Sequence, residues 1–140
     1  MRICIDSCIF IQGLSLLDPA SSRVLELIGP DVPLVIPRLI AQEITRNLRT
    51  TAQVRRFYRL FHERPFAFIV DEPVPRNLVE VYAQKGLSQK ADAYIAAFAD
   101  WMQARYLISD NRHFLRHLTT TSFQVVDASG FLSLWEAGVA

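Results

Sequence analysis

Five short apolar runs recur along the chain, each bounded by polar or turn-forming residues. Runs of this length, rich in Val, Ile, Leu and Phe and apolar on both faces, are typical of buried parallel strands. They cover residues 3–5, 34–36, 66–70, 106–109 and 123–126. We therefore predict five strands, the first of which is followed by a polar break at Asp6 and Ser7.

Segments with helical periodicity separate these runs. Start signals predict helices from Pro19, near Arg38, near Thr51, from Pro75, after a Ser88 cap, from Arg112 and near Ser129. The helix near Thr51 is expected to turn four side chains inward, namely Val54, Phe57, Tyr58 and Phe61. Strands that alternate with helices indicate an α/β fold, a three-layer α/β/α sandwich around a mostly parallel five-stranded sheet.

Length and composition agree with a single domain over residues 1–140. The chain has 140 residues, of which 51% are hydrophobic, and this is enough for one real core. Its two cysteines, Cys4 and Cys8, are too few and too close together for a disulfide framework or a zinc site. We interpret both as small buried hydrophobes in a reducing cytosol, and no apolar stretch is long enough to span a membrane. The expected location is the cytoplasm.

Positive charge is unevenly distributed along the chain. The net charge is +1, so the total gives no argument for nucleic-acid or membrane binding. Residues 38–64 nevertheless hold seven arginines against two acids, and arginine suits phosphate recognition. We expect Arg46, Arg49, Arg55, Arg56 and Arg59 to form an exposed basic face, with a merely solvated helix face as the equal alternative.

Four carboxylates stand where an α/β fold would bring them together. Asp6 and Asp110 directly follow the first and fourth predicted strands, whereas Glu43 and Asp92 lie among apolar residues in predicted helices. In such sheets the active crevice lies beyond the carboxyl ends of the strands, where the strand order reverses. If the order is 3-2-1-4-5, Asp6 and Asp110 flank that point.

Each of these acids also has a simpler explanation. Asp6 could serve simply to end a strand, and Glu43 could be a surface acid paired with Arg46. Asp92 could only favour the start of its helix through the helix dipole, and Asp110 could cap the next short helix. The apolar neighbours of Glu43 and Asp92 make the functional interpretation the stronger one.

Carboxylates crowded together repel one another unless a cation neutralises them. At ~4 Å a pair repels by about 1 kcal/mol in water and about 4 kcal/mol at an effective dielectric of 20. Hard oxygen ligands select Mg²⁺ or Mn²⁺ rather than zinc. Such an ion can activate a water molecule and stabilise charge on a phosphodiester, so hydrolysis of nucleic acid is the reaction that we expect.

Four segments of the chain together resemble a PIN-domain ribonuclease, the family that includes VapC-like toxins. They cover residues 3–7, 36–44, 92–97 and 107–114. The resemblance implies a PIN-like sheet order of 3-2-1-4-5 and an acidic set that binds Mg²⁺ or Mn²⁺ and is catalytic. That set is Asp6, Glu43, Asp92 and Asp110.

The resemblance also implies cleavage of single-stranded RNA by a metal-activated water, a homodimer, and the role of a toxin with a small inhibitory antitoxin. RNA contacts are expected from Ser7, Arg46, Arg49, Asn111, Arg112 and Arg116. We do not assign a catalytic role to His113, because a histidine in this setting is more often a packing or surface residue. The alternative is a catalytically silent PIN-like module that binds RNA or a protein.

Overall fold

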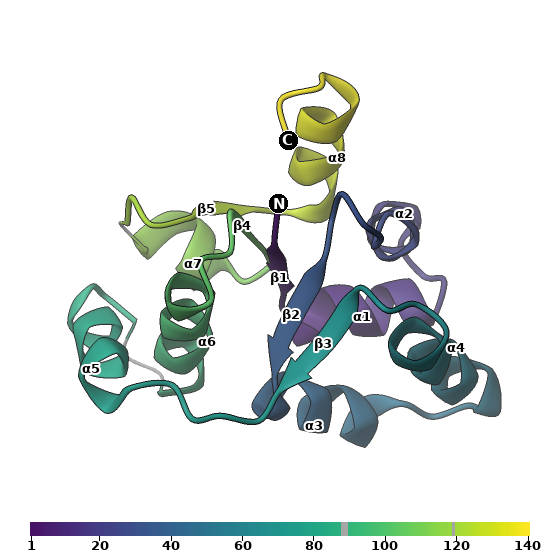
Figure 1. Ribbon diagram of the computed structural model, residues 1–140, viewed down its shortest axis with the longest axis horizontal. Helices are drawn as coiled ribbons and strands as arrows, with labels where there is room; N and C mark the ends of the chain where they lie inside the picture. The colour runs from purple at the N-terminus through teal and green to yellow at the C-terminus, as the bar shows by residue number, and fades with distance from the viewer. Residues whose placement is uncertain (88–89, 119) are drawn as a thin grey trace.

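The computed structural model describes residues 1–87, 90–118 and 120–140, without the side chains of His113 and His117. Its centre is a parallel sheet of five strands in the order β3-β2-β1-β4-β5 (Figure 1). The strands are β1 (Ile3–Ile5), β2 (Leu34–Pro37), β3 (Ala67–Val70), β4 (Tyr106–Ile108) and β5 (Gln124–Val126). The predicted α/β class and strand order are confirmed.

Helices cover both faces of this sheet. The first four are α1 (Ser7–Leu14), α2 (Pro19–Glu26), α3 (Arg38–Asn47) and α4 (Thr51–His62). The others are α5 (Arg76–Gln84), α6 (Lys90–Trp101), α7 (Arg112–His117) and α8 (Ala128–Glu136). Figure 1 shows α1, α2 and α4 to one side of the sheet, and α5, α6 and α7 to the other. The predicted three-layer arrangement is therefore present.

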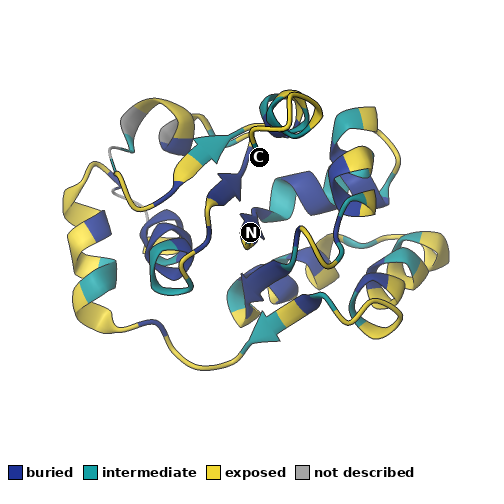
Figure 2. Ribbon diagram, turned by 45° about the horizontal axis from the view of Figure 1, so that its top comes forward, coloured by how far each residue is buried: buried dark blue, intermediate teal, exposed yellow. Residues whose placement is uncertain are grey.

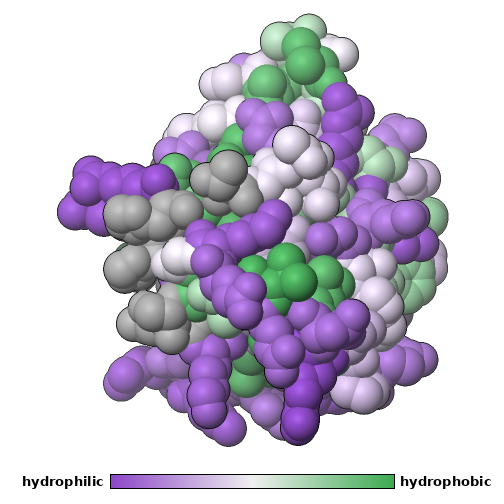
Figure 3. Space-filling model, turned by 90° about the vertical axis from the view of Figure 1, so that its left-hand side faces the viewer, coloured by the Kyte–Doolittle hydropathy of each residue, from purple (hydrophilic) through white to green (hydrophobic). Residues whose placement is uncertain are grey.

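The core lies between the sheet and these helices. β1, β2 and β4 are buried along their whole length, and Figure 2 shows the exposed residues on the outer sides of the helices. From the side of α5 and α7, Figure 3 shows a mainly hydrophilic surface around a smaller hydrophobic area. None of the described helices combines the length and the apolar character needed to cross a membrane.

Helix α1 was not predicted from the sequence. Asp6 acts as its N-cap, and the following residues are apolar on nearly every side, so no polar face reveals the helical period. The helix packs closely on α2 at Gly13. A Cβ atom there would lie 2.7 Å from Leu25 Cδ1 and 3.0 Å from the Ser21 carbonyl oxygen, so a larger residue would require one of the two helices to shift.

The inward face predicted for α4 is partly wrong. Phe57 and Leu60 are buried, whereas Val54 and Tyr58 are 37% and 52% exposed. The helix packs on the molecule along a face centred on Phe57 and Leu60, and Val54 and Tyr58 lie to one side of that face. An apolar stripe in the sequence is therefore wider than the face that the fold buries.

Other predicted local features have mixed outcomes. The turn after α5 does contain a glycine in the left-handed region, since Gly86 has φ of 97°. Asp18 caps α2 by accepting a hydrogen bond from the Ser21 backbone, as its sequence signal indicates. The Ser88 cap of α6 and the side chain of His113 lie outside the described residues.

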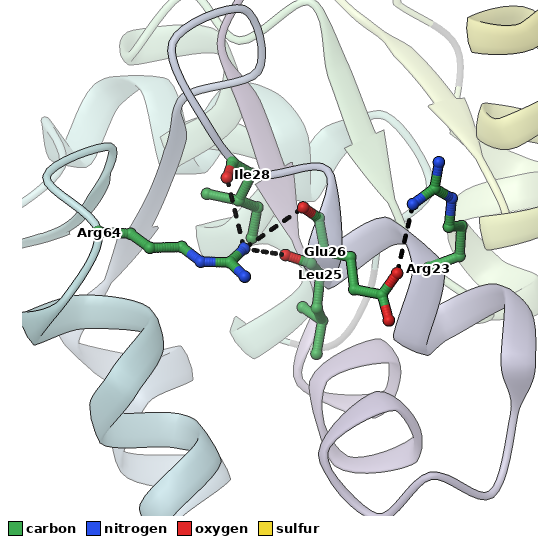
Figure 4. Close-up of polar contacts among 5 residues, drawn as sticks. All are labelled: Arg23, Leu25, Glu26, Ile28 and Arg64. Atoms are coloured by element: carbon green, nitrogen blue, oxygen red, sulfur yellow. Dashed lines mark hydrogen bonds and ion pairs between the residues drawn. The ribbon is translucent and has the colours of Figure 1, made fainter.

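Arg64 links the end of α4 to the end of α2. Its Nη1 atom lies 3.2, 3.3 and 3.5 Å from the carbonyl oxygens of Leu25, Glu26 and Ile28 (Figure 4). Leu25 and Glu26 are the last two residues of α2, and Ile28 lies just beyond it. The negative end of the helix dipole favours a cation there. One guanidinium therefore caps a helix that is remote in sequence.

We expect Arg64→Ala to lower the free energy of unfolding by about 1–2 kcal/mol, because it removes charged hydrogen bonds to carbonyls at a helix end. Urea denaturation followed by circular dichroism measures the change. Arg59→Ala is the matched control, since Arg59 only makes a 3.9 Å surface ion pair with Glu63 and should cost less than about 0.5 kcal/mol. Equal losses in the two variants would contradict the capping role of Arg64.

Candidate active site

The carboxyl ends of β1 and β4 meet at the centre of the sheet, where the order of the strands reverses. The backbone N–H of Asp6 donates to the Ile108 carbonyl oxygen at 2.9 Å and so fixes the residues that follow both strands. Asp6 and Ser109 therefore face each other at the edge where ligands bind in parallel sheets.

A cavity of about 360 Å³ opens at this edge. Its lining comes from the end of β1, from α1, α3 and α6, and from the segment after β4. The lining residues are Asp6, Ser7, Cys8, Glu43, Ala91, Asp92, Ile95, Asp110 and Asn111. All four predicted acids thus share one cavity, and its described lining contains no basic side chain.

Asp6 is the most constrained of these acids. It is only 7% exposed, and its two carboxylate oxygens accept hydrogen bonds of 2.8 Å from the Ser7 backbone and the Ser109 hydroxyl. Burial raises the pKa of the Asp6 carboxyl, the two hydrogen bonds oppose this, and the charges of Glu43 and Asp92 raise it further. Asp6, Glu43 and Asp92 all line the same cavity.

Asp92 and Glu43 complete this coupled set from two different helices. Asp92 is in the first turn of α6, is 8% exposed, and accepts a hydrogen bond of 3.1 Å from the Asn111 side-chain amide. Glu43 is half-buried on α3, where its neighbour Ile44 is fully buried. Glu43 and Asp92, which have apolar neighbours in the sequence, both line the cavity.

Asp110 lies at the rim of the cavity and is exposed. Its pKa is raised, first by partial burial and then by the charges of Asp127 and Asp18. Neither of these two aspartates lines the cavity. Asn111, one residue later, contacts Asp92 instead. The structure thus brings all four acids to one cavity, and Asn111 rather than Asp110 supplies the hydrogen bond to Asp92.

Ser109 is a site residue that the sequence analysis did not single out. It is completely buried, its hydroxyl donates to Asp6, and the same oxygen accepts from the Asn111 backbone at 3.0 Å. The only signal in the sequence was a hydroxyl residue between a buried strand and Asp110. Its role in the structure is to fix the Asp6 carboxylate and the start of the next segment.

Cys8 forms a neutral part of the cavity wall. Burial, and then the charge of Asp6, raises the pKa of the Cys8 thiol to about 11, so the thiol is protonated at neutral pH. Cys4 is fully buried, as expected, whereas Cys8 is only half-buried. The acidic side chains that line this cavity offer oxygen atoms to a metal ion.

The residues expected to contact RNA fall into two groups. Ser7 and Asn111 line the cavity. Arg46, Arg49, Arg112 and Arg116 are exposed and lie outside its lining. The structure thus separates two polar residues beside the acids from four cations farther out.

The donor set fits a hard divalent cation in its chemistry. Asp6, Glu43 and Asp92 supply only oxygen atoms, and none of them forms an ion pair with a described residue. Within the described part of the chain, however, no three acidic, histidine or cysteine side chains converge into a ready-made metal site. Side-chain rotation would be needed before these acids could share one ion.

A comparison with known families gives a match that covers most of the chain. A sequence profile of the PIN domain matches residues 3–117, which include the strand ends and helices that form the cavity. The chain belongs to the PIN-domain family. All four segments on which the resemblance was based, from residues 3–7 to residues 107–114, lie within the matched region.

Solved structures confirm the PIN-like fold. VapBC2 from Rickettsia felis, bound to a promoter DNA fragment, has a TM-score of 0.61 at 17% identity, over 91% of this chain and 98% of that chain. A toxin–antitoxin complex from Klebsiella pneumoniae has a TM-score of 0.62 at 17% identity, over 90% and 97%. FitAcB from Neisseria gonorrhoeae has a TM-score of 0.58 at 20% identity, over 91% and 98%. A search of curated proteins gave no match.

The raised pKa of Asp6 predicts how stability depends on pH. The folded PIN domain holds this proton more tightly than the unfolded chain, so the associated stability is complete below the ordinary pKa of 3.8 and is lost as the pH rises through the raised value. We expect Asp6→Asn to be more stable than the unchanged protein near neutral pH, and the difference to shrink towards about pH 4. Urea denaturation of both proteins in EDTA, from neutral pH to about pH 4, measures this difference in stability.

The matched control is Asp31→Asn. Asp31 is an exposed acid that precedes β2, at the opposite edge of the sheet from Asp6. Its replacement should leave the stability curve close to that of the unchanged protein. A less stable Asp6→Asn variant at neutral pH would show instead that the hydrogen bonds from Ser7 and Ser109 outweigh the effect of burial.

Proposed function

We propose that the protein is a single PIN domain that acts as a metal-dependent endoribonuclease on single-stranded RNA. The observation that carries this proposal is the set of three carboxylates, Asp6, Glu43 and Asp92, in one cavity whose described lining has no basic side chain. A site that concentrates negative charge in this way is suited to hold a cation against a phosphodiester.

The metal ligands in this proposal are Asp6, Glu43 and Asp92, with Asp110 at the rim as the fourth acid. When bound, Mg²⁺ or Mn²⁺ supplies activation of a water molecule and neutralises charge on the phosphodiester. Each oxygen of Asp6 accepts one hydrogen bond within the protein, which leaves a further lone-pair direction on each for a cation. Ser109 holds the carboxylate in that orientation.

Proton binding at Asp6 competes with metal binding. Because burial and the neighbouring acids raise the pKa of the Asp6 carboxyl, its carboxylate form is disfavoured until a cation enters the cavity. The hydrogen bonds from Ser7 and Ser109 act in the opposite direction and favour the carboxylate. These two donors therefore help to keep Asp6 ready for a metal ion.

RNA contacts around the cavity complete the proposal. Arg46 and Arg49 lie at and beyond the end of α3, which carries Glu43, whereas Arg112 and Arg116 lie on α7 beyond Asp110. Exposed guanidinium groups in these places are suited to bind backbone phosphates on either side of the acids. Ser7 and Asn111 would contact the bound RNA at the acids themselves.

The partners of the relatives suggest a biological role. Structures from Klebsiella pneumoniae and Rickettsia felis contain a toxin–antitoxin complex and VapBC2, respectively. By analogy, we propose that this protein is a cytoplasmic, homodimeric toxin that a small antitoxin protein inhibits.

A second candidate function is a catalytically silent module that binds RNA or a protein. The absence of three convergent metal-binding side chains among the described residues favours it. The presence of the full acidic set in one cavity favours the enzyme. The two candidates differ in metal binding and in cleavage, and the following experiments separate them.

We expect millimolar Mg²⁺ or Mn²⁺ to raise the melting temperature by about 5 °C, because an ion that binds only the folded state stabilises it by mass action. Differential scanning calorimetry with and without EDTA measures this shift. The shift should disappear in Asp92→Asn and persist in the control Asp31→Asn. A protein whose melting temperature is independent of these ions would favour the silent module.

Cleavage should leave 5′-phosphate and 3′-hydroxyl ends and should stop in EDTA. We expect Asp6→Asn, Glu43→Gln and Asp92→Asn to lower the rate more than about 100-fold, and Ser109→Ala about tenfold because Ser109 acts only by orienting Asp6. Asp110→Asn should have a milder effect than the first three. End-group analysis of a single-stranded RNA measures the outcome, and cyclic phosphate ends or cleavage in EDTA would rule out the mechanism.

A further inference from the structure

The outward face of α4 carries an aromatic and basic stripe, which we define as Arg55, Tyr58 and His62. Their spacing of three and four residues places them on one side of the helix, and all three are exposed. The rings of Tyr58 and His62 lie nearly parallel, with an interplanar angle of 16° and centroids 5.5 Å apart. Figure 2 shows the exposed outer side of α4 at the right-hand edge of the molecule.

Packing does not account for this stripe. Phe57 and Leu60 attach α4 to the core and are 4% and 5% exposed, whereas Tyr58 is 52% exposed. The tyrosine therefore buries only about half of its surface, although its ring is one of the largest apolar groups on the helix. Its ring stacks on His62 and meets Phe57 edge-on, with centroid separations of 5.5 and 5.8 Å.

The charge of α4 indicates the kind of ligand that suits this face. The helix Thr51–His62 contains three arginines and no acid. Arg56 is used within the fold, since it donates to the Leu14 carbonyl oxygen at 2.7 Å, and Arg59 lies 3.9 Å from Glu63. Arg55 forms no ion pair with a described residue, so it remains available beside Tyr58.

A second groove beside α4 is a separate feature. It has a volume of about 410 Å³ and lies between α1, α2 and α4, and Arg56, Arg59 and Leu60 belong to its lining. Arg55, Tyr58 and His62 do not line it. The stripe also lies outside the lining of the acidic cavity.

We infer that this stripe is a second RNA-contact surface, on which a base of single-stranded RNA stacks against Tyr58 while Arg55 binds an adjoining phosphate. An exposed ring beside a cation is the combination that binds single-stranded nucleic acid, because every base has a π-face and every nucleotide a phosphate. Tyr and Arg are also common at protein interfaces, but the three arginines of α4, with no acid on the helix, favour a polyanion. The inference rests on the proposed function for the identity of the ligand, and it extends the substrate beyond the acids.

Fluorescence anisotropy with a labelled oligoadenylate of about 12 nucleotides, in EDTA, tests this surface without requiring cleavage. Tyr58→Ala should weaken binding about tenfold, Tyr58→Phe should bind nearly as well as the unchanged protein, and Arg55→Ala should reduce the dependence of affinity on salt. Phe68→Ala is the matched control and should change little, because Phe68 is an aromatic residue of β3 that is similarly exposed, at 51%.

The same measurement with an abasic oligonucleotide separates stacking from charge. Tyr58→Ala should leave its affinity unchanged, because no base is present to stack. Equal losses on both oligonucleotides, an effect of Phe68→Ala as large as that of Tyr58→Ala, or no RNA binding by the unchanged protein would overturn the inference. A change of oligomeric state in Tyr58→Ala, seen by sedimentation, would overturn it in favour of a protein interface.

The two proposals fail in different ways. A protein that binds oligoadenylate through Tyr58 but cuts no RNA with Mg²⁺ would refute the nuclease and leave the stripe in place. A protein that cuts RNA while Tyr58→Ala keeps the affinity of the unchanged protein would refute the stripe alone.

Discussion

Burial of the Asp6 carboxylate at the end of β1 is the constraint around which the site is arranged. A charge in a position that is 7% exposed lowers stability unless hydrogen bonds or a cation compensate for it. The chain supplies two hydrogen bonds, from Ser7 and Ser109, but it also places Glu43 and Asp92 near enough to raise the pKa of Asp6. Stability alone would not select such a cluster, and carboxyl groups with a perturbed pKa in a cavity are typical of functional sites.

The arginines illustrate how one residue type serves different purposes in this fold. Arg64 caps α2, Arg56 binds the Leu14 carbonyl oxygen at the end of α1, and Arg38 pairs with Asp71 at 2.6 Å. These three side chains support the packing of neighbouring elements, so the count of arginines between residues 38 and 64 overstates the surface available to RNA. Arg46 and Arg55 are exposed and form no ion pair with a described residue.

Much of the candidate site could be predicted from local sequence, but its finer arrangement could not. Acids after a buried strand or among apolar helix residues are conspicuous, and Asp6, Glu43 and Asp92 all line the cavity. Whether Asp110 or Asn111 contacts Asp92 depends on how the chain turns after β4, and in the structure Asn111 makes the contact. The role of Ser109 could not be predicted, because a serine next to a strand has no distinctive pattern and its partner Asp6 is 103 residues away.

The sequence by itself determined the five strands, most of the helices and the α/β class, because apolar periodicity and capping residues are local signals. It also indicated the acids, since a charge in an apolar segment stands out. Only the tertiary structure decided that α1 is a helix, that Tyr58 faces outward and that Asn111 rather than Asp110 hydrogen-bonds Asp92. Each of these depends on contacts between segments remote in sequence. Helix α1 packs against α2 at Gly13, and α4 buries only the face that its neighbours can cover. The cavity forms where β1 and β4 end side by side.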